Sequence, residues 1–362
     1  MDHGRSNAGA ARGGGGVGMT VPTDLPDFQG LRVAVVGDPI ADLYLHAHPR
    51  RLSREAPVMV LRHLSERIGA GGAANVARNL RALGPSVSLF GAVGRDTNGR
   101  ELARILGADE VDISCLSHIA DWTTPTKTRV LAALSRRFPQ QVLRIDREPS
   151  RPVPASSRAE LAGQLRERAG EFDAVVISDY EYGAVASEVG AVASELAATG
   201  KLVVLDPRRD LELFSGITAL TPNVEELARF VGVEAARLDD AGALRAAAVR
   251  LLADGACRWL LVTRGNLGMA LFGEGLPAEG VAVEASGSGE VTDVSGAGDT
   301  AAAAFTLSLA GGFGAPEAMV VANAASGVVV MENGTAVCPW PDLKAALSTT
   351  PAPVRLGRPS YT

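Results

Sequence analysis

Several residue types and patterns are scarce in this chain of 362 residues. Aromatic residues make up only 4% of it, so a buried core must consist mainly of Ala, Val and Leu. The three cysteines and five histidines are too few and too scattered for a disulfide framework or a metal-ligand pattern, and sparse cysteine is typical of a reducing cytoplasm. No uninterrupted apolar run approaches the ~18 residues of a membrane span.

Basic residues are also too few for a general nucleic-acid binder. The formal net charge is −6 and the isoelectric point is about 5.5, whereas such binders usually carry a basic face. Small phosphates are still possible ligands, because backbone N–H groups at helix starts bind them without basic side chains. Glycine, by contrast, is abundant at 41 residues, without the Gly-X-Y period of collagen.

The two ends of the chain are predicted to be tails. Residues 1–29 are rich in Gly and Ala without apolar periodicity, which indicates a disordered segment and not a secretory signal. Translation could start at Met1 or Met19. Residues 349–362 form a second expected tail, so residues 30–348 would be one domain.

The middle of the chain alternates between two kinds of segment. Short apolar runs that end in Gly or Asp start near Leu31, Val87, Asp173, Lys201 and Trp259, and segments with helical spacing separate them. This alternation predicts an α/β fold, a doubly wound and mostly parallel sheet flanked by helices. Two regions, about 43–68 and 111–147, alternate polar and apolar residues. They indicate antiparallel strands of a small β-sheet lid, or else ordinary surface hairpins.

The most informative motif is Gly296-Ala297-Gly298-Asp299, which stands between an expected strand and an Ala-rich helix. Glycines at such a turn let the backbone approach a ligand, and the first helical N–H groups form an anion site. A carboxylate there could accept a hydroxyl proton while the oxygen attacks a phosphoryl group. The alternative is that Asp299 only caps the helix.

Two further motifs lie near the front of the chain. Gly69, Gly71 and Gly72 open a helix that carries Asn75, an amide suited to sugar hydroxyls. Their spacing does not fit a dinucleotide fingerprint. Asp38 and Asp42 follow the first strand, where ligands of parallel sheets bind and where carboxylates select polyhydroxylated ligands. They could instead be solvated loop acids.

Two smaller motifs follow later strands. Asn223 and Glu226 could orient a metal ion through water or simply begin a helix. Thr263, Arg264 and Gly265 end another apolar run, where the phosphates of a nucleotide could lie.

Together these motifs resemble those of the ribokinase-like (PfkB) carbohydrate kinase family, in order and spacing, from Leu31 to about Leu347. Within it the chain is most similar to the kinase half of the bacterial heptose enzymes, which act on D-glycero-β-D-manno-heptose 7-phosphate. The segments that carry this resemblance are Gly37–Asp42, Leu52–Val58, Gly71–Ala77, Thr126–Val130, Gln141–Asp146, Ser178–Tyr180 and the motif ending in Asp299.

The resemblance implies an ATP- and Mg²⁺-dependent sugar kinase with a lid that closes over the sugar. It implies a base at Asp299, an anion hole at Gly296, Ala297 and Gly298, and water-mediated Mg²⁺ binding at Glu226. For the other ligands it implies a nucleotide site at Asn223, Thr263, Arg264, Gly265 and Asn323, and a sugar site at Asp38, Asp42, Gly71, Gly72 and Asn75. Lys127, Arg129 and Arg144 of the lid would bind a sugar phosphate, or else lie on solvated strand faces. A homodimer through the lid is a further implication.

Two departures affect the sugar side. The heptose kinases have Asp-Tyr-x-Lys-Gly where this chain has Tyr182 in place of the Lys, and they favour Asp-Pro-Lys where this chain has Arg208. An Arg keeps the charge but has a different shape. A kinase for another sugar or a nucleoside is therefore an alternative, and so is a sugar-phosphate sensor without activity. A dehydrogenase is the weakest option.

Overall fold

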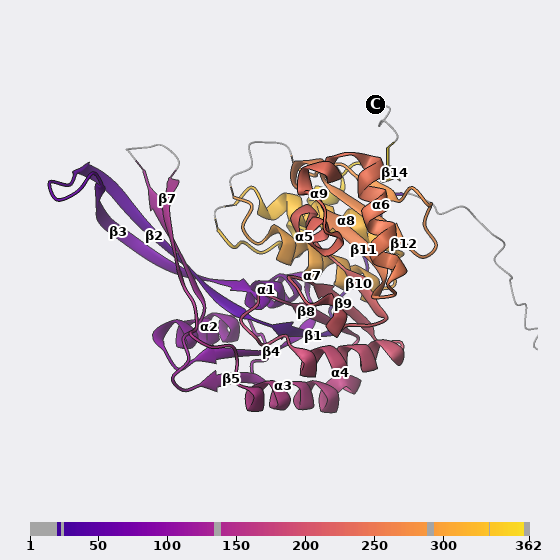
Figure 1. The fold of residues 1–362 in the computed structure, drawn as a ribbon, viewed down its shortest axis with the longest axis horizontal. Coiled ribbons are helices and arrows are strands. Elements are labelled where there is room, and N and C mark those ends of the chain that lie inside the picture. Colours follow the sequence, from indigo (N-terminus) through magenta and orange to yellow (C-terminus); the bar gives the residue numbers. More distant parts are fainter. Residues whose placement is uncertain (1–19, 23–24, 134–138, 288–292, 333, 358–362) are drawn as a thin grey trace, which may run out of the picture.

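The computed structural model describes the whole chain except residues 1–19, 23–24, 134–138, 288–292, 333 and 358–362. Across its described part runs a large sheet with the strand order β14-β13-β12-β11-β10-β9-β8-β1-β4-β5 (Figure 1). Its strands are β1 (Arg32–Gly37), β4 (Ser86–Gly94), β5 (Leu116–Ile119), β8 (Ala174–Ser178), β9 (Leu202–Asp206), β10 (Ile217–Leu220), β11 (Cys257–Thr263), β12 (Met269–Gly273), β13 (Val281–Val283) and β14 (Val354–Arg355).

The large sheet is parallel from β5 to β11 and antiparallel from β11 to β14. The chain winds from β1 towards β5 first and from β8 towards β11 afterwards, so its direction reverses between β1 and β8. In such doubly wound sheets ligands bind outside the carboxyl ends of the strands at this reversal. The predicted fold class is therefore confirmed, and the reversal point marks where to look for a site.

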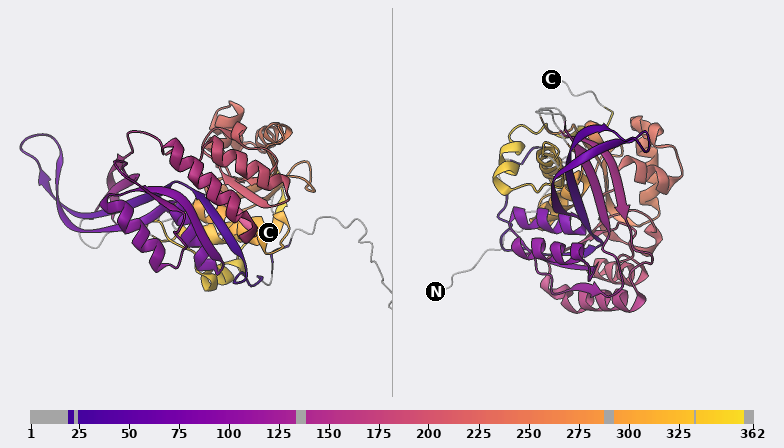
Figure 2. Two further views of the ribbon diagram at one scale, coloured as in Figure 1. Left: turned by 90° about the horizontal axis from the view of Figure 1, so that it is seen from below. Right: turned by 90° about the vertical axis from the view of Figure 1, so that its left-hand side faces the viewer.

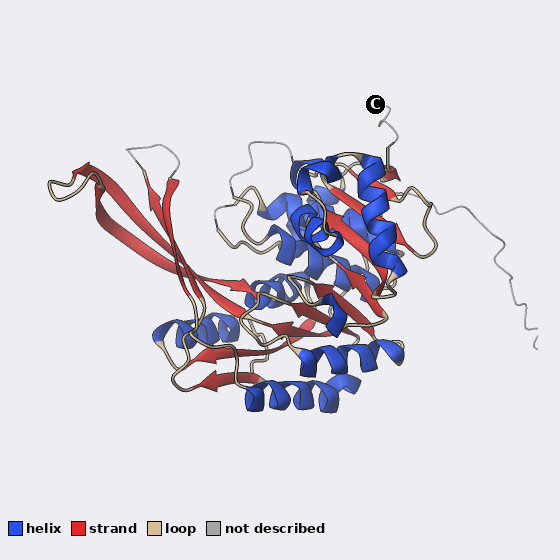
Figure 3. Cartoon of the chain, in the orientation of Figure 1, coloured by secondary structure: helices blue, strands red, loops and turns tan. Residues whose placement is uncertain are grey.

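Helices cover both faces of the large sheet (Figure 3), and each face has its own core. Along β1, Val33 and Val35 face one core and Ala34 and Val36 the other, as the two-residue period of a strand requires. This explains why the strand reads as one continuous apolar run. The helices that pack into the first core are α1 (Ala73–Leu83), α2 (Thr97–Ala108), α7 (Ala297–Ala310), α8 (Ala315–Val329) and α9 (Trp340–Leu347). Those that pack into the second core are α3 (Ala155–Arg168), α4 (Ser187–Ala198), α5 (Val224–Val231) and α6 (Ala241–Ala253).

Short 3₁₀ turns cover Ala169–Glu171, Leu211–Leu213, Ala235–Asp239 and Gly265–Leu267. None of the helices in the described ranges is long and apolar enough to cross a membrane.

A separate small sheet projects from the body as an arm (Figure 2). Its strands lie in the order β3-β2-β6-β7 and are β2 (Pro39–Leu52), β3 (Met59–Gly72), β6 (Thr126–Ala132) and β7 (Gln140–Arg147). The expected lid strands are thus present, but the central pair, β2 and β6, is parallel and not antiparallel. Both hairpins start at the body and run outward, so their first strands have the same direction.

Three expected boundaries differ in the structure. The second lid segment, expected at 111–147, contains β5, which extends the large sheet beside β4, so the lid strands start only at Thr126. Ordered packing starts before residue 30, because the Phe28 ring is buried against Trp340, with ring centroids 5.5 Å apart. The expected C-terminal tail contains β14, which pairs with β13. Most of the predicted N-terminal tail lies outside the described residues.

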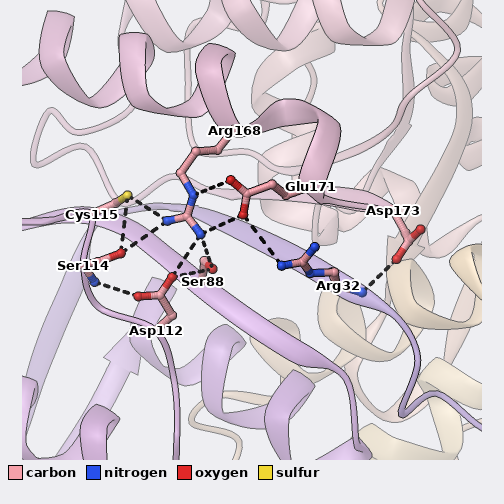
Figure 4. A network of polar contacts seen from close by, with 8 residues as sticks. All are labelled: Arg32, Ser88, Asp112, Ser114, Cys115, Arg168, Glu171 and Asp173. Carbon is pink, nitrogen blue, oxygen red and sulfur yellow. Dashed lines mark hydrogen bonds and ion pairs between the residues drawn. The ribbon is translucent and has the colours of Figure 1, made fainter.

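A polar network connects α3 to β4 and to the segment before β5, at one edge of the large sheet, as Figure 4 shows. The Arg168 guanidinium at the end of α3 donates to Asp112 at 3.2 Å, to Glu171 at 3.1 Å and to the Cys115 sulfur at 3.2 Å. Burial raises the pKa of the Asp112 carboxyl, but hydrogen bonds from Ser114, Ser88 and Arg168 outweigh it and lower that pKa to about 2. The network joins the helix to the link between β4 and β5.

Candidate active site

The motif ending in Asp299 forms the start of α7. Gly296 precedes the helix with φ 82° and ψ 0°, a left-handed conformation that L side chains rarely adopt. A Cβ atom on Gly296 would lie 2.5 Å from the Asn75 amide nitrogen, so the glycine also lets α7 and α1 approach each other. No side chain caps α7. The Ala297 N–H donates to the Val294 carbonyl at 3.3 Å, so the N–H groups that follow it in the first turn are the ones open to a ligand.

The Asp299 carboxylate is buried, with 3% of the residue exposed, and both of its oxygens accept hydrogen bonds. The Asn75 amide donates to Oδ2 at 2.9 Å, and the Tyr180 hydroxyl donates to Oδ1 at 2.8 Å. Burial raises the pKa of Asp299 to about 6, although these two hydrogen bonds and Arg208 act in the opposite direction. A carboxylate with this pKa is mostly charged at neutral pH and can accept a proton.

A cavity of about 670 Å³ opens beside Asp299 at the carboxyl ends of β9, β10 and β11. Eight residues predicted from the sequence line it: Asn223, Glu226, Thr263, Arg264, Gly265, Gly296, Gly298 and Asp299 itself. Asn323 does not line this cavity. It is buried on α8, where its amide donates to the Glu284 carbonyl at 2.9 Å.

Asn223 and Glu226 form a capping box at the start of α5. The Asn223 side chain accepts from the Glu226 N–H at 2.8 Å, and the Glu226 carboxylate accepts from the Asn223 N–H at 2.9 Å. These two residues therefore start the helix, which is one of the two roles that the sequence predicts for them. The arrangement also fixes the Glu226 carboxylate in the cavity wall, where it pairs with Arg208.

The carboxyl groups of Asp206 and Glu226 in this cavity wall are also candidate ligands for a cation. Burial first, and the charge of Glu226 second, raise the pKa of Asp206 to about 8. A cation beside these two carboxyl groups would favour the charged form of Asp206. Hard cations such as Mg²⁺ favour carboxylate oxygens and often keep several waters. No cluster of three or more His, Cys, Asp or Glu suitable for a metal occurs in the described ranges. The two carboxyl groups of the wall fit an ion that keeps several of its waters.

A second cavity, of about 860 Å³, lies on the other side of Tyr180 and Arg208, which line both cavities. Its wall includes five basic residues, namely Lys127, Arg144, Arg151, Arg208 and Arg229. Within the part of the chain that is described, Lys127, Arg151 and Arg229 are in no ion pair, whereas Arg144 pairs with Asp146 at 2.6 Å. Cations without acidic partners suit a phosphate group.

The sequence did not predict Arg151 and Arg229 as residues of the site, although both line the second cavity. Arg229 follows Glu226 by three residues on α5, a spacing that places both on one side of the helix and could have indicated it. Arg151 lies in an irregular segment before α3, for which no periodicity gives a signal.

Asp42 and Arg129 pair with each other instead of lining either cavity. The Arg129 guanidinium donates to Asp42 Oδ1 at 2.5 Å, and their side chains are 11% and 4% exposed. A Cβ atom on Gly71 would lie 2.3 Å from Asp42 Oδ2, so this glycine makes room for the pair. The pair joins β2 to β6 next to the Asp299 site.

Asp38 holds the loop that carries Tyr180. Its carboxylate accepts the N–H groups of Tyr180 at 3.0 Å, Tyr182 at 3.2 Å and Ala184 at 2.9 Å. A Cβ atom on Gly72, which has φ +58°, would lie 2.5 Å from the Asp38 carbonyl. Asp38 therefore fixes the wall between the cavities.

Comparison with known proteins agrees with this geometry. The model of the "pfkB family carbohydrate kinase" matches residues 31–343. The "Bifunctional protein HldE" of Azorhizobium caulinodans is 40% identical over 335 residues, which cover 91% of this chain and 67% of that protein. Its namesake in Geobacter metallireducens is 39% identical over 307 residues, covering 84% of this chain and 60% of that protein. The chain thus spans about two thirds or less of these relatives.

Solved structures show the same fold. Ribokinase of Arabidopsis thaliana, complexed with ribose and ATP, superposes with a TM-score of 0.66 and 22% identity, covering 88% of this chain and 98% of that one. Phosphofructokinase-2 of Escherichia coli, in complex with substrates and products, superposes with a TM-score of 0.69 and 21% identity, covering 88% of this chain and 98% of that one. The family match over most of the sequence and the identity to its curated relatives establish that the chain belongs to the pfkB family of carbohydrate kinases and is an ATP-dependent sugar kinase.

Proposed function

We propose that this kinase phosphorylates a hydroxyl of a sugar that already carries a phosphate, and that the substrate is D-glycero-D-manno-heptose 7-phosphate with C1 as the acceptor. The observation that carries the proposal is the second cavity, which Tyr180 separates from the cavity beside Asp299. Its five basic residues outnumber its three acidic ones (Asp146, Glu148 and Glu181), and Lys127, Arg151 and Arg229 form no ion pair among the described residues. The similarity to the HldE proteins supports the heptose.

In the proposed reaction ATP occupies the 670 Å³ cavity, with its γ-phosphate at the start of α7. Asp299 takes the proton of the acceptor hydroxyl while that oxygen forms a bond to the γ-phosphorus. The bond from this phosphorus to the bridging oxygen breaks, and ADP leaves. In the motif of Gly296, Ala297 and Gly298, the N–H groups that are open to a ligand would stabilise the charge of the phosphoryl group in transit.

Glu226, with Asp206 beside it, would hold Mg²⁺ through water. The ion would neutralise phosphate charge in the transition state. Arg208, which pairs with Glu226 and lines both cavities, stands between the two ligands. Sparse cysteines fit the proposed location of the enzyme in a reducing cytoplasm.

A kinase for an unphosphorylated sugar or a nucleoside is the second candidate. Tyr182 favours it, because an aromatic ring in the basic cavity can stack on a neutral ligand. An ADP-release assay with heptose 7-phosphate, fructose phosphates, ribose and adenosine separates the candidates. We expect turnover with phosphorylated sugars, and activity with ribose or adenosine alone would overturn the proposal.

Substitutions in the basic cavity test the phosphate contact. Lys127→Met and Arg151→Met should each raise KM for the phosphorylated sugar roughly 10- to 30-fold with little change in kcat, because each removes a charged hydrogen bond made in ground and transition states alike. KM for ATP should stay constant. Arg166→Met and Lys344→Met, far from the cavity, are matched controls. If the two cavity variants behave like these controls, the phosphate lies elsewhere.

We also propose that the small sheet binds a second copy of the chain. Its strands and the turn between β2 and β3 expose Leu52, Val58, Met59, Leu64, Val142, Leu143 and Ile145, each at least 50%. Exposed apolar patches of this kind mark interaction surfaces. Sedimentation velocity should show a dimer that Leu52→Glu and Leu143→Glu convert to a monomer. Val249→Glu on α6, also exposed, should leave it a dimer. A wild-type monomer would contradict the proposal.

A further inference from the structure

Tyr180 has an unusual position between the two cavities. It follows β8, and its ring lies 4.8 Å from the Lys127 ammonium and 4.6 Å from the Arg208 guanidinium. Its hydroxyl donates to Asp299 Oδ1 at 2.8 Å. These three contacts hold the ring and direct its only polar atom to the carboxylate.

The backbone next to Tyr180 is fixed as well. Asp38 accepts its N–H at 3.0 Å, and the neighbouring Asp179 carboxylate accepts the N–H of Glu181 at 2.9 Å. Glu181 has φ 64°, so the chain makes a tight turn directly after Tyr180. A phenol on a backbone held in this way cannot swing freely away from Asp299.

From this geometry we propose that Tyr180 is a positioning residue for the base: its hydroxyl holds Asp299 Oδ1, keeps the carboxylate in the charged form and leaves its remaining lone pairs to the acceptor hydroxyl. The proposal rests on the proposed function, which takes Asp299 as the base. A carboxylate has about four lone-pair sites, so donors from Asn75 and Tyr180 leave room for a third partner.

Other charged groups also act on Asp299. Arg208, which follows β9, stabilises its charge, whereas Asp42 on β2 and Asp206 on β9 oppose it. Asn75 on α1 donates to the other oxygen. Replacing Tyr180 by Phe keeps the ring that Lys127 and Arg208 contact and removes only the hydroxyl.

The test is the pH profile of kcat/KM for Tyr180→Phe. Loss of a hydrogen bond to a charged group should move the acid limb upward by about one pH unit. The ratio of variant to wild-type activity should therefore fall about fivefold between pH 8 and pH 6. A role in folding alone would lower activity by the same factor at every pH. Tyr182→Phe, whose hydroxyl contacts Glu148 and not Asp299, should leave the acid limb in place.

Thermal melts and ATP titrations should show that the Phe variant is folded. A ratio that stays flat from pH 6 to pH 8 would overturn the proposal for Tyr180. This failure is distinguishable from failure of the proposed function, because substitution of Asp299 itself reports on the base. If that variant is inactive while the Tyr180→Phe profile is unshifted, only the role of Tyr180 is wrong.

Discussion

Asp299→Asn should lower kcat by about a thousandfold or more and leave ATP binding intact. General bases commonly contribute 10²- to 10⁴-fold, and an amide cannot take the acceptor proton. The fold should tolerate the change, because Asn has the same shape and the Tyr180 hydroxyl can turn from donor to acceptor. The start of α7, which would bind the γ-phosphate, keeps its backbone.

The pH dependence of the wild type gives an independent check of this base. Asp299 has a raised pKa of about 6, owing mainly to burial, and must be deprotonated to act. Wild-type kcat/KM should therefore fall as the pH drops below about 6, and the residual activity of Asp299→Asn should lack this limb. ADP release and calorimetric ATP titration measure the two quantities. Near-normal turnover of the variant would refute the mechanism.

The second large effect is expected for Gly296→Ala, with a loss of at least about 10²-fold in kcat/KM. The new Cβ atom would lie 2.5 Å from the Asn75 amide, which holds Asp299. Moving Asn75 misplaces the base, and displacements near 1 Å can cost about 10²-fold. The positive φ of 82° adds strain of roughly 1 kcal/mol.

Gly312→Ala separates the clash from the strain. Gly312 follows the other end of α7 with φ +91°, and nothing lies within 4 Å of a Cβ atom there. This variant should lose a similar amount of stability through strain but keep its activity. Activity and thermal unfolding of both variants provide the comparison. Equal activity in the two variants would show that the contact with Asn75 is unimportant.

Local patterns identified most of the predicted residues that line the cavity proposed for ATP. The glycines before Asp299 and the spacing of Asn223 and Glu226 each depend on a turn or a helix start a few residues long, which the sequence determines locally. The structure accordingly brings both motifs to one cavity. Asn323 was expected there from a resemblance alone, and its amide instead bonds to the Glu284 carbonyl.

The residues expected around the sugar were harder to place from the sequence, because their positions depend on contacts between distant segments. Asp42 and Arg129 are 87 residues apart and pair across β2 and β6, so neither faces a cavity. The parallel pairing of these strands is a tertiary feature that alternation within each segment does not reveal. Tyr180 likewise meets Asp299 from 119 residues away, and no local pattern indicates this hydrogen bond.

The long strand β2 has a consequence for how the arm can move. It runs without a loop from Ala41, paired with Thr126 beside the site, to Leu52 near the tip. The ladder with β3 is irregular at two places, between His46 and Ala47 and between Pro49 and Arg51. If β2 slid past β3 by one residue, every side chain of the strand would turn to the opposite face of the sheet. We therefore expect the arm to move by bending at these irregularities, while its base beside Asp299 stays fixed.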